Sequence, residues 1–232
     1  MASGIIFDFD GVIADSTPVG LVKTVSVIQK LNLKFGPDPD DLPEAIRKLW
    51  GLPYPDIFKA LGEKYSWTDS QVLQVQTLAL ETEMEIQPVP GMVECLTALT
   101  KKLPTAVISN REQSTGEVLF SQLGLEDVPF DKVQFKESCR YFKPDHRCLV
   151  PAMNLLVKKS AGITLNKPVL MLGDTVDYDL KATQTWQELI IFIGVVSGIS
   201  TAEEFIEAGV PEHRIIKGIH NIPSRLAEIT NL

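Results

Sequence analysis

Short apolar runs recur along the chain, and helix-length segments separate most of them. The runs lie at 4–10, 105–109, 168–172, 189–193 and 214–217. Buried strands that alternate with helices are typical of a parallel sheet, because the connecting helices cover both of its faces. The pattern therefore predicts an α/β domain built around a parallel sheet.

Two of the intervening segments have the apolar spacing of amphipathic helices. They are 91–102 and 111–124, and the second ends at Gly124, a residue type that often terminates helices. Each helix is expected to bury one side against the sheet. The positions predicted to be buried are Val93, Leu96, Leu99, Val118, Leu119 and Leu123.

The alternation stops between residues 15 and 88, where the sequence has helical patterns and no convincing buried strand. We predict an inserted all-helical cap domain at 15–88, within a core domain formed by 1–14 and 89–232. Pro18 and Pro88 bracket the insertion as joints, since proline stops helices. A unit joined in this way is suited to act as a lid over a site.

The first and last helices of the insertion are the best defined. The first carries Leu21, Val25 and Ile28 on one side, and the last opens with Thr68 and Gln71 at the spacing of a capping box. Both features predict stable helices with one apolar face.

Composition limits the location and the partners of the protein. The chain has 232 residues, 44% of them hydrophobic, and its net charge is −8. A protein with this charge lacks the basic surface that nucleic acid or an anionic membrane favours, so neither is an expected partner. The three cysteines, Cys95, Cys139 and Cys148, form no short metal-binding or disulfide pattern. We expect reduced thiols and a cytoplasmic protein.

Two acids follow the first apolar run. Asp8 and Asp10 project to the same side if the strand continues to residue 10, while Phe7 and Phe9 project to the other. Burying two like charges is costly unless a cation compensates them. Because ligands collect beyond the carboxyl ends of parallel strands, this pair predicts a site there.

Other polar side chains follow later strands. Ser109 and Asn110 come after the second apolar run, Asp174 comes after the third, and Lys143 lies between them in "FKPD". Asp174 could join Asp8 and Asp10 around a divalent cation, and oxygen ligands of this kind suit Mg²⁺.

In order, these motifs resemble those of the haloacid dehalogenase superfamily of phosphatases. The matching segments are "DFDGV" at 8–12, "SN" at 109–110, "KP" at 143–144 and "GDTVDYD" at 173–179. The resemblance covers nearly the whole chain and is nearest to the phosphoglycolate phosphatase-like and β-phosphoglucomutase-like branch. It implies a Rossmann-like core with a small helical cap.

The resemblance also implies roles for the acids. Asp8 would be the nucleophile that forms an aspartyl-phosphate, and Asp10 would be the general acid and then the base. Asp8, the backbone carbonyl of Asp10 and Asp174 would hold Mg²⁺. The remaining phosphate contacts would come from Ser109, the amide of Asn110 and Lys143.

The fourth motif leaves a second acid undecided. The branch commonly has an acid four residues after Asp174, but that position here is Tyr178. Asp177 and Asp179 flank it, and either could be the second acid near the metal. The sequence "LKAT" after Asp179 resembles the usual helix start and favours Asp179.

Two arginines are further candidates for substrate binding. Arg47 precedes "LWGLP" in the cap, and Arg111 follows the second motif, where it could reach an anionic end of the substrate. An exposed position on a helix explains Arg111 equally well, and it explains Arg47 better than a substrate contact does.

The sequence supports a Mg²⁺-dependent phosphatase that acts on a small phosphorylated metabolite, with phosphoglycolate as one named possibility. A phosphomutase of the β-phosphoglucomutase type is the alternative, and a non-catalytic regulatory or binding protein with the same fold is a further one. A dehalogenase of the same superfamily would not need Asp10, so the presence of Asp8 and Asp10 together argues against that activity. For the oligomeric state, a monomer and a homodimer both agree with the sequence.

Overall fold

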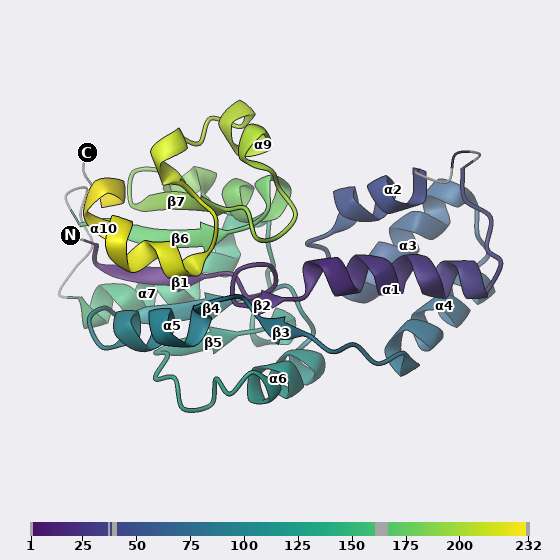
Figure 1. The fold of residues 1–232 in the computed structure, drawn as a ribbon, viewed down its shortest axis with the longest axis horizontal. Coiled ribbons are helices and arrows are strands. Elements are labelled where there is room, and N and C mark those ends of the chain that lie inside the picture. Colours follow the sequence, from purple (N-terminus) through teal and green to yellow (C-terminus); the bar gives the residue numbers. More distant parts are fainter. Residues whose placement is uncertain (1, 37, 39–40, 161–166, 231–232) are drawn as a thin grey trace.

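The chain forms a sheet-containing lobe and a helical lobe, shown by a computed structural model (Figure 1). The structure describes residues 2–36, 38, 41–160 and 167–230. Among these residues, no helix combines the length and the apolar character that crossing a membrane requires.

The central sheet has six parallel strands in the order β5-β4-β1-β6-β7-β8. This arrangement confirms the predicted α/β class. The strand bounds are β1 (Gly4–Phe7), β4 (Thr105–Ile108), β5 (Lys132–Gln134), β6 (Val169–Gly173), β7 (Ile190–Val195) and β8 (Ile215–Ile216).

Helices cover both faces of the sheet, as a buried parallel sheet requires. Ile5 and Phe7 of β1 pack in one apolar cluster, and Ile6 between them packs in the cluster on the opposite face. The first cluster includes residues of α5 (Met92–Thr100), α6 (Gln113–Gln122) and α10 (Ile222–Thr230). The second includes residues of α7 (Val150–Lys159), α8 (Lys181–Thr183) and α9 (Ala202–Glu207).

The helical lobe follows β1 and has an apolar core of its own. Its helices are α1 (Thr17–Lys30), α2 (Asp41–Leu49), α3 (Tyr54–Tyr65) and α4 (Asp69–Glu81). The predicted capping box is present at the start of α4, where Thr68 and Gln71 exchange hydrogen bonds. The structure therefore shows the helical insertion, whereas its domain limits at 15–88 stay a prediction.

A two-stranded connection joins the lobes, and the sequence pattern did not predict it. β2 (Ala14–Asp15) pairs antiparallel with β3 (Gln87–Pro88), so the chain leaves and re-enters the core side by side (Figure 1). This pairing brings the two ends of the insertion together at one edge of the core.

Three local expectations were wrong. β1 ends at Phe7, because the backbone turns after Asp8 and does not stay extended to residue 10. Val93 is 45% exposed and Val118 is 57% exposed, since α5 and α6 bury neighbouring helical faces instead. Those faces carry Met92 and Cys95 in α5, and Leu119 in α6.

Candidate active site

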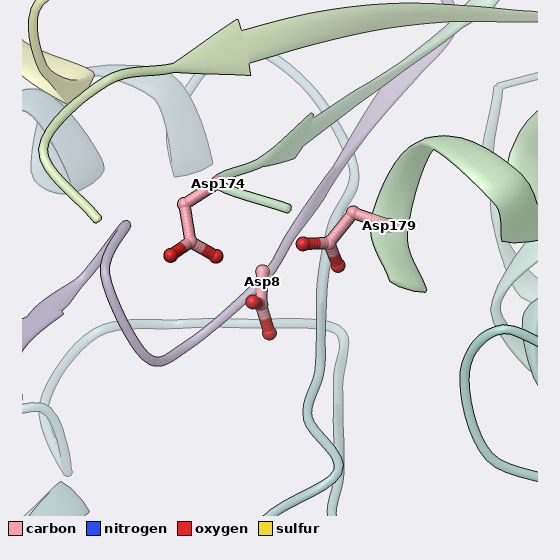
Figure 2. A group of neighbouring side chains, drawn as sticks. All are labelled: Asp8, Asp174 and Asp179. Carbon is pink, nitrogen blue, oxygen red and sulfur yellow. The ribbon is translucent and has the colours of Figure 1, made fainter. Parts of the chain in front are cut away.

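Three buried carboxylates meet at the carboxyl end of the sheet (Figure 2). Asp8 directly follows β1 and Asp174 directly follows β6, and these strands are hydrogen-bonded neighbours. Asp179 comes from the π-helical turn Val176–Leu180. One oxygen of each carboxylate lies within 4.8 Å of the others. The adjacent strand ends therefore explain why residues distant in sequence form one cluster.

Lys143 lies between two of these carboxylates. Its Nζ donates to Asp8 Oδ1 at 2.5 Å and to Asp179 Oδ1 at 2.6 Å, and its side chain is buried. Burial alone would lower the pKa of Lys143, but Asp179 and Asp8 outweigh that effect and raise the pKa. Lys143 is therefore a charged ammonium group that contacts two of the three acids.

One lysine does not neutralise three buried acids. Burial, followed by the negative charge of Asp179, raises the pKa of Asp8 to about 7. Burial and the charges of Asp179 and Asp8 also raise the pKa of Asp174 well above its usual value. Both shifts indicate uncompensated negative charge at a buried site.

The donor set fits a hard divalent cation. Among the described residues, none donates a hydrogen bond to Asp8 Oδ2 or to Asp174 Oδ1, whereas the Ile199 amide donates to Asp174 Oδ2 at 2.9 Å. Two buried carboxylates thus keep an oxygen for a ligand. Mg²⁺ prefers carboxylate and carbonyl oxygens of this kind, so the cluster fits this ion.

The backbone packs closely around Asp174. A Cβ atom at Gly198 would lie 1.8 Å from Asp174 Oδ2, and one at Gly11 would lie 2.3 Å from the same oxygen. Gly11 also has φ +76°, in the region that favours glycine. These two glycines allow the loops after β1 and β7 to enclose the carboxylate and fix its orientation.

Asp10 lies apart from the three buried acids and has different partners. Arg111 Nε donates to Asp10 Oδ2 at 3.1 Å, Arg111 Nη2 donates to Oδ1, and Ser16 Oγ donates to Oδ1 at 2.5 Å. Burial pushes the pKa of Asp10 up, but Arg111 and then Ser16 outweigh it and lower the pKa. Asp10 is therefore ionised in this arrangement.

Ser109 and Asn110 follow β4, next to β1. Ser109 Oγ accepts a hydrogen bond from the Arg111 amide at 3.0 Å. The Asn110 side chain bonds both the amide and the carbonyl of Lys143, and it also donates to the carbonyl of Gly51 at 2.6 Å. Asn110 therefore connects the helical lobe to the segment that carries Lys143.

A cavity of about 160 Å³ lies between the two lobes and opens onto these groups. Its core side includes seven predicted site residues: Asp8, Asp10, Ser109, Asn110, Arg111, Lys143 and Asp174. Most of the predicted chemistry is thus brought together around one small space.

Two predicted site residues lie elsewhere. Arg47 does not line this cavity, because its guanidinium pairs with Glu44 and with Glu204 of α9. Asp177 is exposed and pairs with Lys181 at 2.5 Å, whereas Asp179 belongs to the buried cluster. Of the two acids that the sequence left open, the structure places Asp179 beside Asp8.

Several cavity residues had no signal in the sequence. Lys23, Trp50 and Tyr54 come from the helical lobe, and Thr175 bonds Asp179 through both its amide and its hydroxyl. Lys23 lies on a helix whose other lysine, Lys30, is exposed, and nothing in the sequence distinguishes the two. Only the packing of the lobes identifies the cavity residues that come from the helical lobe.

The comparison with protein families confirms the resemblance. The profile of the haloacid dehalogenase-like hydrolase family matches residues 5–191, and the chain belongs to this family. A comparison with curated protein sequences finds no significant match.

Solved structures from several organisms have the same fold. A hydrolase from Pseudomonas syringae has a TM-score of 0.74 at 20% identity, covering 98% of this chain and 99% of its own. A protein named a predicted phosphoglycolate phosphatase, from Haemophilus somnus, has a TM-score of 0.70 at 16% identity, covering 96% and 97%. A protein provisionally named a β-phosphoglucomutase, from Thermotoga maritima, has a TM-score of 0.63 at 21% identity, covering 98% and 99%. At these identities the similarity shows the fold alone.

Proposed function

We propose that the protein is a Mg²⁺-dependent phosphatase that hydrolyses a small phosphomonoester through an aspartyl-phosphate. The observation that carries the proposal is the arrangement of Asp8, Asp174, Asp179 and Lys143 beside a small cavity that Asp10 also lines. Membership of the haloacid dehalogenase-like hydrolase family supports it.

Asp8 is the proposed nucleophile. An oxygen of its carboxylate forms a bond to phosphorus while the bond from phosphorus to the ester oxygen breaks, and Asp10 gives its proton to the leaving alkoxide. In the second step Asp10 takes a proton from water, the water oxygen bonds to phosphorus, and the bond to Asp8 breaks. Inorganic phosphate leaves, and both acids return to their starting forms.

The contacts of Asp10 favour one of its two roles. Its pairing with Arg111 stabilises the carboxylate, which is the form that accepts a proton from water. To donate a proton in the first step, Asp10 must separate from Arg111. The exposed fraction of the Asp10 side chain, 25%, shows that it borders the cavity and is not enclosed like Asp8.

Asp8, the backbone carbonyl of Asp10, Asp174 and Asp179 are the residues that would hold Mg²⁺. When bound, Mg²⁺ supplies positive charge that offsets the charge of the phosphoryl group and of the acids. Lys143 holds Asp8 and Asp179 in place and adds a fixed positive charge of its own. Ser109 borders the same space, where its hydroxyl can contact a phosphoryl oxygen.

A panel of phosphomonoesters, assayed with and without Mg²⁺, tests the proposal. We expect phosphate release that requires Mg²⁺ and that falls by at least about 10³-fold in Asp8→Asn. Asp10→Asn should also lose activity, whereas Asp127→Asn, an exposed aspartate, should keep it. Turnover that is unchanged in Asp8→Asn would contradict the proposal. Conversion of β-glucose 1-phosphate to glucose 6-phosphate without phosphate release would favour the mutase.

A further inference from the structure

Lys23 is a cation of the cavity that has no acidic partner among the residues that the structure describes. It lies on α1, lines the same cavity as Asp8, and has a half-buried side chain. Within the described part of the chain, no carboxylate forms an ion pair with its Nζ. The Nζ lies 5.5 Å from the centre of the Tyr54 ring, whose face can stabilise a cation.

The charge of Lys23 is not compensated by its neighbours. Lys23 and Arg111 line the same cavity, and burial, followed by the positive charge of Arg111, lowers the pKa of Lys23. Arg111 already pairs with Asp10, and among the described ion pairs none joins Lys23 to Glu112, another acid that lines the cavity. Although the net charge of the protein is −8, this cavity cation has no ion pair with any acid in the described part of the chain.

The rest of the wall contributed by the helical lobe is mostly apolar. The Tyr54 hydroxyl is already hydrogen-bonded to Thr24 at 3.1 Å. A substrate with many hydroxyl groups would leave several of them unpaired against this wall. The apolar lining residues are Trp50, Leu52, Ile57, Ala79, Leu80 and Met84. One anionic group beside Lys23 fits this wall better than a sugar ring.

We propose that Lys23 binds a second anionic group of the substrate, a carboxylate, and thereby selects short phosphorylated carboxylic acids. This assignment rests on the proposed phosphatase function and adds the substrate class to it. Lys23 would bind the carboxylate at the helical lobe, while the phosphoryl group lies at Asp8 on the core. A small cavity lined by a cation of the helical lobe and by the acid cluster of the core therefore sets both the size and the charge of the substrate.

Matched pairs of esters test the assignment. Phosphoglycolate is compared with 2-hydroxyethyl phosphate, and 3-phosphoglycerate with glycerol 3-phosphate, because each pair differs chiefly by a carboxylate. We expect wild type to prefer the carboxylates in kcat/KM by about 10- to 100-fold, the range that one charged hydrogen bond supplies. Lys23→Met should remove this preference by raising KM for the carboxylates, and it should raise KM much less for the esters that lack a carboxylate. Lys23→Arg should retain most of it.

Lys30→Met is the matched control, since Lys30 is exposed on the same helix. A binding measurement on wild type is independent of how well the variants fold: phosphonoacetate should bind about 10- to 100-fold tighter than 2-hydroxyethylphosphonate.

The outcomes separate the two proposals. Equal kcat/KM for both members of each pair in wild type would overturn the assignment of Lys23 and leave the phosphatase standing. An equal loss on both members in Lys23→Met, or equal binding of the two phosphonates, would do the same. If wild type releases no phosphate from these esters or from an aryl phosphate, the phosphatase function and the assignment both fail.

Discussion

Asn110 holds the backbone of Lys143 from both sides. Its Oδ1 accepts a hydrogen bond from the Lys143 amide at 2.9 Å, and its Nδ2 donates to the Lys143 carbonyl at 2.8 Å. The same Nδ2 donates to Gly51 of the helical lobe at 2.6 Å. Family resemblance implied a phosphate contact through the Asn110 amide, and the side chain has this additional, structural task. A change at Asn110 therefore reaches Lys143 and the helical lobe together.

Asn110→Asp tests this task. The variant keeps the acceptor for the Lys143 amide but places carboxylate oxygens against the carbonyls of Lys143 and Gly51. We expect a loss of about 1–3 kcal/mol in the free energy of unfolding, measured with urea, because the carbonyls of buried Lys143 and half-buried Gly51 lose their donor. Phosphatase activity should fall as well. Asn154→Asp, an exposed change on α7, is the control, and equal stability of the two variants would contradict the prediction.

Lys143→Met removes the ammonium group between Asp8 and Asp179. Breaking a buried ion pair leaves uncompensated buried charge, so we expect a loss of about 3–5 kcal/mol in unfolding free energy with EDTA present. Lys158→Met, at an exposed position of α7, should change stability by less than about 0.5 kcal/mol. Part of the loss should be recovered at pH values low enough to protonate the acids. A variant as stable as wild type at pH 8 would show that Lys143 does not balance this cluster.

The fold was predictable wherever burial leaves a strong pattern. β1, β4, β6 and β7 appear as apolar runs because helices cover both of their faces. The edge strand β5 was missed because Lys132 and Gln134 make up most of its three residues. β2 and β3 were missed because two-residue strands carry no periodicity.

The site was predictable to the extent that it lies at strand ends. Asp8 and Asp174 follow apolar strands, so their meeting could be expected from parallel topology. The pairing of Asp10 with Arg111 could not be predicted from topology, because it depends on how the turns after β1 and β4 fold. The position of Lys23 in the cavity depends on how the helical lobe docks onto the core, and no local sequence pattern reports that docking.

The two acids of the fourth motif should differ sharply when substituted. Asp179 is buried beside Asp8, and its Oδ2 also accepts hydrogen bonds from the Thr175 amide and hydroxyl. We expect Asp179→Asn to raise the Mg²⁺ concentration needed for half-maximal activity by about 10- to 100-fold. Asp177→Asn, which loses only an exposed pair with Lys181, should need the same Mg²⁺ concentration as wild type for half-maximal activity. The opposite ranking of the two variants would identify Asp177, and not Asp179, as the second acid near the metal.

The cysteines should react in order of their exposure. Burial raises the pKa of Cys95 and of Cys148 to about 12, so both remain thiols at pH 8, and only the thiolate is nucleophilic. Cys139 is half-buried. Iodoacetamide at pH 8 should therefore label one site in the native protein and three after unfolding, as counted by intact mass. Cys139→Ser should abolish the native labelling, and rapid labelling of that variant would contradict the buried positions.

Arg47 and Glu204 connect the helical lobe to the core by a two-point ion pair. Arg47 Nη2 donates to Glu204 Oε1 at 2.9 Å and Nη1 donates to Oε2 at 3.3 Å, with both side chains about one-third exposed. Because exposed pairs contribute at most about 1 kcal/mol, we expect Arg47→Gln to raise KM by no more than about fivefold. High salt should reduce the difference from wild type, since it screens the pair.

A double-mutant cycle decides between this connection and the substrate contact predicted for Arg47 from the sequence. If Arg47 acts through Glu204, the change in KM caused by Arg47→Gln should largely vanish in a Glu204→Gln background. If Arg47 contacts the substrate, its effect should persist there at full size. Lys48→Gln, on the same helix but with its ion pair to Glu44, should leave KM unchanged in both backgrounds. We expect the first result, because the Arg47 side chain lines the outer surface between α2 and α9 and not the cavity that holds Asp8.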